Sequence, residues 1–68
     1  HPPKIEPMVR SIIEDLRSGR RDQVPMWLEK NGHATLVNYM AVRDSDGNYV
    51  GTVEVVQDME FAKKHFER

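Results

Sequence analysis

Apolar side chains in the first quarter of the chain follow the spacing of one helical face. They recur three, one, three, one and three residues apart, at Ile5, Met8, Val9, Ile12, Ile13 and Leu16. This spacing predicts an α-helix whose apolar stripe packs into a core. Pro7 has no amide hydrogen to donate, so the helix is expected over about 7–18, with Pro7 in its first turn and Gly19 ending it.

Three strand-like runs follow, at about 23–30, 33–43 and 49–57. Asn31-Gly32 separates the first two and is the strongest short hairpin signal, because both residues tolerate the positive φ of a type I′ turn. The segment 45–48, Ser-Asp-Gly-Asn, closes the second hairpin. These turns predict an antiparallel meander in which 30 pairs with 33, 28 with 35, 26 with 37, 43 with 50, 39 with 54 and 37 with 56.

This register sorts the strand side chains onto two faces. The first face collects Val24, Met26, Leu28, Thr35, Val37, Tyr39, Ala41, Val50, Thr52, Glu54 and Val56. The second collects Trp27, Leu36, Asn38, Met40, Val42, Gly51, Val53, Val55 and Gln57. Both faces are too apolar for a sheet with one side in water, and the helix over 7–18 can cover only one of them.

The two border strands of the sheet are expected to differ. Pro25 cannot donate a ladder hydrogen bond, which places the strand over 23–30 at one border. The strand over 49–57 forms the other border, and its apolar composition calls for a partner strand that the chain does not supply.

A last helix is expected over about 59–66, with Asp58 as its N-cap. Its apolar patch is short and consists of Phe61, Ala62 and Phe66. The whole pattern therefore predicts one small α+β domain over 1–68: an N-terminal helix packed on a three-stranded antiparallel meander sheet, followed by a short C-terminal helix.

Composition narrows the classes of protein. The chain has 68 residues, 38% hydrophobic and 31% charged, so it forms one marginally stable core at most. It has no cysteine, which excludes disulfides and thiolate chemistry within the chain and fits a cytoplasmic location. A net charge of −1 gives no long-range attraction for nucleic acid. No stretch is long and apolar enough to span a membrane, so neither nucleic acid nor membrane is an expected partner.

Catalytic and metal-binding patterns are not found in the sequence. It shows no Ser, His and Asp order, no glycine-rich phosphate loop and no carboxylate pair, which predicts a protein that is not an enzyme. The three histidines, His1, His33 and His65, have no second ligand at a spacing that builds a metal site.

Short motifs occur in a fixed order along nearly the whole chain. They are His1-Pro-Pro-Lys4, Ser18-Gly19, Trp27, Gly32, Tyr39-Met-Ala-Val-Arg-Asp44, Gly47, Gly51, Val53-Glu54-Val55 and Gln57-Asp58. Together they resemble a PAS domain, of the kind in uncharacterised prokaryotic proteins that also carry a hemerythrin-like cation-binding domain. The resemblance implies that the chain holds the last core helix, the final three strands and the start of the exit helix. The N-terminal half of the PAS fold, including the strand that pairs with 49–57, is then expected to be absent.

The resemblance implies a non-catalytic sensory or regulatory module. Such a module binds a small ligand or a protein partner and passes a signal through its C-terminal helix. The ligand is expected on the first face, at Val37, Tyr39, Thr52, Glu54 and Val56. There Glu54 either binds a polar group of the ligand, or has a structural role, paired with Tyr39 or with a group of the missing half. The structural role is favoured, because isolated buried carboxylates usually serve packing networks. Heme-binding PAS domains carry a histidine ligand on the helix corresponding to 7–18; none is present there, and the cofactor is left unknown.

The alternative is a structural homodimerisation module without a ligand. Its interface would be the second face, at Trp27, Met40, Val53 and Val55. These side chains form either a second core layer or a dimer patch, and their size and apolar character favour the dimer patch. A homodimer is therefore the expected assembly.

Overall fold

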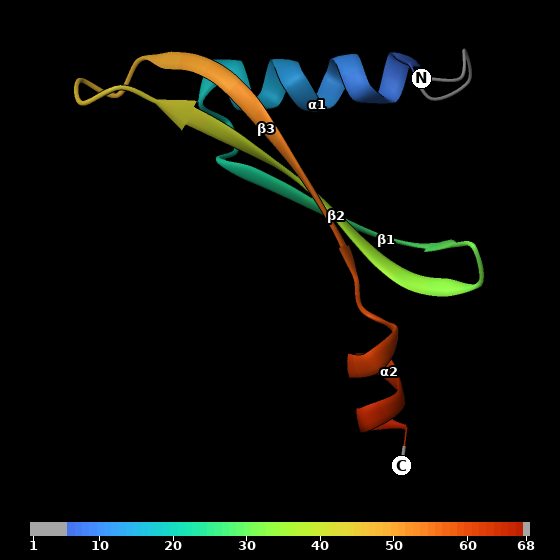
Figure 1. Cartoon of the computed structure of the whole chain (residues 1–68). Coiled ribbons are helices and arrows are strands. Elements are labelled where there is room, and N and C mark those ends of the chain that lie inside the picture. The colour runs from blue at the N-terminus through green and yellow to red at the C-terminus, as the bar shows by residue number, and fades with distance from the viewer. Residues whose placement is uncertain (1–5, 68) are drawn as a thin grey trace.

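The computed structural model describes residues 6–67, and its elements follow in the order helix, three strands, helix. They are α1 (Glu6–Ser18), β1 (Gln23–Lys30), β2 (His33–Arg43), β3 (Tyr49–Asp58) and α2 (Glu60–Phe66). The predicted α+β fold class is confirmed. Figure 1 shows α1 lying across one end of the twisted sheet, while α2 projects from the other end. The motif at His1–Lys4 and the first stripe residue, Ile5, lie outside the described residues.

The helix α1 contains Pro7 in its first turn and buries Val9, Ile12 and Leu16. Other positions of the predicted stripe are less covered: Met8 is 43% and Ile13 37% exposed. The helix ends before Gly19, whose φ of 85° is the left-handed conformation typical of a residue that follows a helix.

The sheet has the order β1-β2-β3, so Pro25 lies in a border strand as its missing amide hydrogen requires. Asn31 and Gly32 both have positive φ, 52° and 78°, as the tight turn between β1 and β2 demands. Five of the six predicted pairs are present: Lys30 with His33, Leu28 with Thr35, Met26 with Val37, Tyr39 with Glu54, and Val37 with Val56.

The sixth predicted pair, 43 with 50, is wrong. Arg43 pairs with Tyr49, because the register shifts by one residue between Val42 and Arg43. The loop before β3 explains the shift. The carboxylate of Asp44 accepts the amides of Asp46 and Asn48, both at 2.9 Å, and this curls the chain within a compact turn before the ladder resumes.

The core lies between α1 and one end of the sheet. Its buried members are Ile12, Leu16, Val24, Val37 and Tyr39, with Met26, Ala41 and Tyr49 partly buried around them. We call the sheet face under α1 the inner face and the opposite one the outer face. No described element covers most of the outer face, and the molecule measures 45 × 31 × 15 Å. Within residues 6–67, β3 pairs with β2 only, so its other edge is unpaired.

The start of α2 differs from expectation by one position. Met59, not Asp58, occupies the N-cap position, and its side chain makes no capping hydrogen bond. The Asp58 carboxylate still accepts the amide of Glu60 at 2.9 Å, so Asp58 satisfies a free amide of the first turn from one residue farther back.

Candidate functional site

The five residues predicted to face a ligand lie on the inner face, at different depths. Val37 and Tyr39 are 8% and 7% exposed and belong to the core beneath α1. Thr52 is half-buried, and Glu54 and Val56 are exposed along β3. The structure therefore places two of the five as a floor and three as an accessible row on the border strand.

Tyr39 and Glu54 face each other across β2 and β3, as the predicted register required. Burial raises the pKa of the Tyr39 phenol, and the neighbouring Glu54 carboxylate raises it further. Closer to α1, the hydroxyls of Tyr49 and Thr52 are hydrogen-bonded at 2.5 Å. The accessible row thus offers a hydroxyl and a carboxylate beside apolar surface.

The far end of the inner face contains a cavity that sequence reasoning missed. It has a volume of about 310 Å³ and is lined by Lys30, Asn31, His33, Thr35, Val56 and Asp58. Only Val56 belongs to the predicted ligand-facing set. The signal was present in the register, because the pairing of 35 with 58 brings the turn after β1 next to the end of β3.

The four residues predicted for an interface lie on the outer face. Trp27 is 66%, Met40 39% and Val53 45% exposed, and Val55 is half-buried. Met40 and Val53 are direct cross-strand partners. This cluster is apolar, and α2, which lies near Trp27, is the one described element close to it.

Asn38 lies on the same outer face, opposite Val55. Its side-chain nitrogen donates to the Gln23 side-chain oxygen at 3.1 Å. Its own side-chain oxygen is buried and has no hydrogen-bond partner among the described residues. A buried amide oxygen without a hydrogen bond costs stability.

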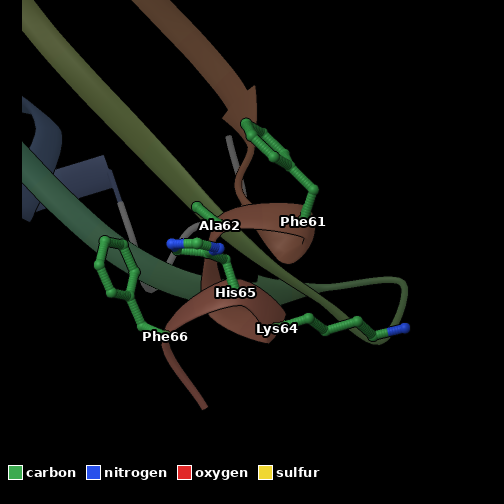
Figure 2. Close-up of a pocket in the computed structure, with 5 residues that line it drawn as sticks. All are labelled: Phe61, Ala62, Lys64, His65 and Phe66. Atoms are coloured by element: carbon green, nitrogen blue, oxygen red, sulfur yellow. The ribbon is translucent and has the colours of Figure 1, made fainter. Parts of the chain in front are cut away.

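The helix α2 lies against the outer face near Trp27. A cavity of about 340 Å³ separates them, with an almost wholly apolar lining from Trp27, Ala34, Met59, Ala62, Lys63 and Phe66. A second depression, shown in Figure 2, is lined by Phe61, Ala62, Lys64, His65 and Phe66. All five side chains of that second depression come from α2 itself, so it is relief on one short helix and not a site built between elements.

The described residues contain no cluster of three or more His, Cys, Asp or Glu side chains that could hold a metal ion. His33 contacts Asp58, and the His65 ring packs edge-on against Phe66 with centroids 5.0 Å apart. His1 lies outside the described residues. Neither described helix is long and apolar enough to cross a membrane.

Comparison with known proteins identifies a family model and similar solved structures. The family model described as a PAS domain matches residues 1–60. No curated protein matches the chain. The crystal structure of a C-terminal domain from Streptococcus mutans is similar over 98% of this chain, with 43% sequence identity and a TM-score of 0.83. The chain covers 49% of that Streptococcus mutans chain, so it spans about half its length.

Proposed function

The chain belongs to the PAS domain family, and from that membership we propose that it is a non-catalytic sensory or regulatory module. A small ligand or a protein partner binds the inner face, and α2 carries the resulting change onward. The observation that carries the proposal is the uneven cover of the inner face. The helix α1 buries Val37 and Tyr39 but leaves Glu54 and Val56 accessible.

The ligand would lie along β3, on the accessible row. Thr52 and Glu54 supply a hydroxyl and a carboxylate, and Val56 supplies apolar contact, with Val37 and Tyr39 beneath as the floor. Small-molecule sites combine apolar walls with a few polar groups in this way. Val56 also lines the cavity that contains Asp58, so a ligand there would reach the residue that leads into α2.

Chemical-shift mapping with a screened library of small polar ligands tests this placement. We expect the perturbed amides to centre on Thr52, Glu54 and Val56, and Glu54→Gln to weaken binding. Glu29→Gln is the matched control, because Glu29 is an exposed carboxylate on β1 and lies outside the row. Perturbations centred on Trp27, Met40 and Val53 without a change of oligomeric state would overturn the placement.

The second candidate function is homodimerisation through the outer face, without a ligand. The exposure of its apolar side chains favours it: Trp27 is 66%, Met40 39% and Val53 45% exposed. Trp27, Met40, Val53 and Val55 are the side chains that such an interface would cover.

Two finer expectations stay predictions. The subtype of PAS domain that accompanies a hemerythrin-like cation-binding domain is testable from the gene that encodes this chain. The identity of a cofactor or ligand is testable by an absorption spectrum of the purified protein, in which bound flavin or heme would give visible bands.

A further inference from the structure

The first turn of α2 is tied to the β1–β2 hairpin by a compact group of hydrogen bonds. The Met59 amide donates to the Ala34 carbonyl oxygen at 2.7 Å. The Ala34 amide in turn donates to the Glu60 carboxylate, also at 2.7 Å. One oxygen of Asp58 accepts the Glu60 amide, and the other lies 2.5 Å from Nδ1 of His33. Residues that are 25 or more positions apart in sequence therefore meet at one point.

The rest of α2 is loosely held. None of its residues is buried, and Phe61 and Phe66 are 75% and 83% exposed. Besides the hydrogen bonds of its first turn, its link to the sheet is the apolar cavity that it shares with Trp27. A helix of seven residues is unstable by itself, so these few contacts decide whether α2 lies against the sheet.

We propose that His33, Asp58 and Glu60 form a proton-controlled clasp, which holds α2 against the sheet while His33 is protonated and loosens when His33 loses its proton. Histidine is the member whose charge changes near neutral pH. The inference rests on the proposed role of α2 as the output element. It adds the condition under which α2 is held.

The charges around His33 act mainly in one direction. Its hydrogen bond to Asp58 raises the pKa of His33 above 6.5, the charges of Asp58 and Glu60 add to this, and Lys64 of α2 opposes it. Lys30 of β1 lines the cavity that His33 and Asp58 also line, and is a further cation near His33. The hydrogen bond from His33 lowers the pKa of Asp58, and that from the Ala34 amide lowers the pKa of Glu60.

The sign of the pH dependence follows from these shifts. Because the pKa of His33 is raised in the closed clasp, its protonated side chain contributes its full stabilisation below pH 6.5. That stabilisation is lost as the pH rises through the higher pKa that His33 has in the folded protein. The lowered pKa values of the two carboxyl groups stabilise the clasp above pH 3.8 for Asp58 and above pH 4.5 for Glu60. This stabilisation is lost as the pH falls below those values and the carboxylates take up protons. The clasp is therefore tightest in weakly acidic solution, at roughly pH 5 to 6.

Trp27 is the only tryptophan and lines the cavity beneath α2, so its fluorescence reports whether α2 is docked. At fixed protein concentration we expect a transition with a midpoint above pH 6.5, and we expect this transition to be lost in His33→Gln. His65→Gln is the matched control, because His65 lies on α2 but outside the clasp, and it should keep the transition. Survival of the transition above pH 6.5 in His33→Gln, or its absence from the unaltered protein, would overturn the proposal.

Hydrogen exchange provides a second readout that does not depend on fluorescence. After correction for intrinsic exchange, the Ala34 amide should lose protection as pH rises through the transition, whereas the Val37 amide in the middle of β2 should not. Equal protection of Ala34 in His33→Gln and the unaltered protein at every pH would refute the clasp. Both readouts concern α2 alone, so their failure would leave the ligand site along β3 standing, and loss of ligand binding in Glu54→Gln would not affect them.

Discussion

The side chain of Arg43, on β2, caps the C-terminal turn of α1 by donating a hydrogen bond to the carbonyl oxygen of Leu16. Its Nη2 donates to the carbonyl oxygen of Leu16 at 2.6 Å, across 27 positions of sequence, and its Nε lies 3.3 Å from the Asp22 carboxylate. Leu16 is the most deeply buried side chain, with 0% exposure. The β-bulge between Val42 and Arg43 lies directly beside this contact. The residue at the β-bulge is therefore the same residue that caps the end of α1.

Arg43→Ala should lower the free energy of unfolding by about 1.5 kcal/mol, because the Leu16 carbonyl then loses its charged donor and keeps only the longer hydrogen bond from the Gly19 amide, at 3.4 Å. Arg43→Lys should recover part of the loss, since it keeps the charge but not the planar fork. Urea unfolding measures both. Arg10→Ala is the control: its ion pair with Glu6 is largely exposed and should contribute little. Equal costs at the two arginines would mean that the link to Leu16 adds nothing.

Gly32→Ala should destabilise the protein by about 1 to 2 kcal/mol, because a side chain at φ 78° is strained even where there is room for it. A Cβ there would meet no atom within 4 Å, so the cost is one of backbone conformation alone. Gly51→Ala is the matched control, with equally open space but no positive φ, and should be neutral or slightly stabilising. Thermal unfolding of the two variants should separate them clearly; indistinguishable midpoints would contradict the type I′ turn.

Tyr39 and Glu54 should be energetically coupled. A double-mutant cycle with Tyr39→Phe and Glu54→Gln is expected to give a coupling of about 0.5 kcal/mol or more, because the two side chains are direct cross-strand neighbours. Urea unfolding of the four proteins supplies the cycle. Strict additivity would show that the pair does not interact despite its register.

The Tyr39 phenol should titrate above its ordinary pKa of 10.0, for the two reasons of burial and the Glu54 charge. Glu54→Gln should bring the pKa down but not back to 10.0, since burial remains. Ultraviolet absorbance measures phenolate formation, and Tyr49→Phe removes the signal of the other tyrosine. Because the folded pKa is raised, stability should fall as pH rises above 10.0. If the pKa of Tyr39 is the same in Glu54→Gln and in the protein with Glu54, the carboxylate makes no contribution to it.

The 68-residue chain should associate at micromolar concentration, because the outer face and the free edge of β3 are uncovered in residues 6–67. Light scattering should show species larger than a monomer, and Val53→Lys should shift them toward the monomer by placing a charge in the exposed patch. Ser11→Lys adds the same charge on the solvent side of α1 and should change little. A sharply melting monomer would contradict the expectation.

Sequence reasoning succeeded where a feature is local. Asn31-Gly32 specified the first turn through its backbone alone, and alternation then carried the register to Tyr39 and Glu54. Pro25 placed β1 at a border because one missing amide hydrogen has the same consequence in any sheet.

It failed where two elements must first be docked. The apolar stripe of α1 predicts that the helix packs on the sheet but gives neither its angle nor its position, so the burial of Val37 and Tyr39 relative to Val56 could not be derived. The bulge at Val42 depends on how Asp44 folds its own loop. The contact between His33 and Asp58 needed both the register and the direction of two exposed side chains, neither of which has a periodic signal.

The shortest dimension of the molecule, 15 Å, leaves little depth between the two faces of the sheet. Glu54 points to one side, and its chain neighbours Val53 and Val55 point to the other, so a rotation of the strand at this point moves all three together. A displacement of β3 therefore reaches both faces of the sheet directly, without a chain of packed side chains between them. In a sheet this thin, a ligand that rotated β3 from the inner face would also shift Val53 and Val55 on the outer face.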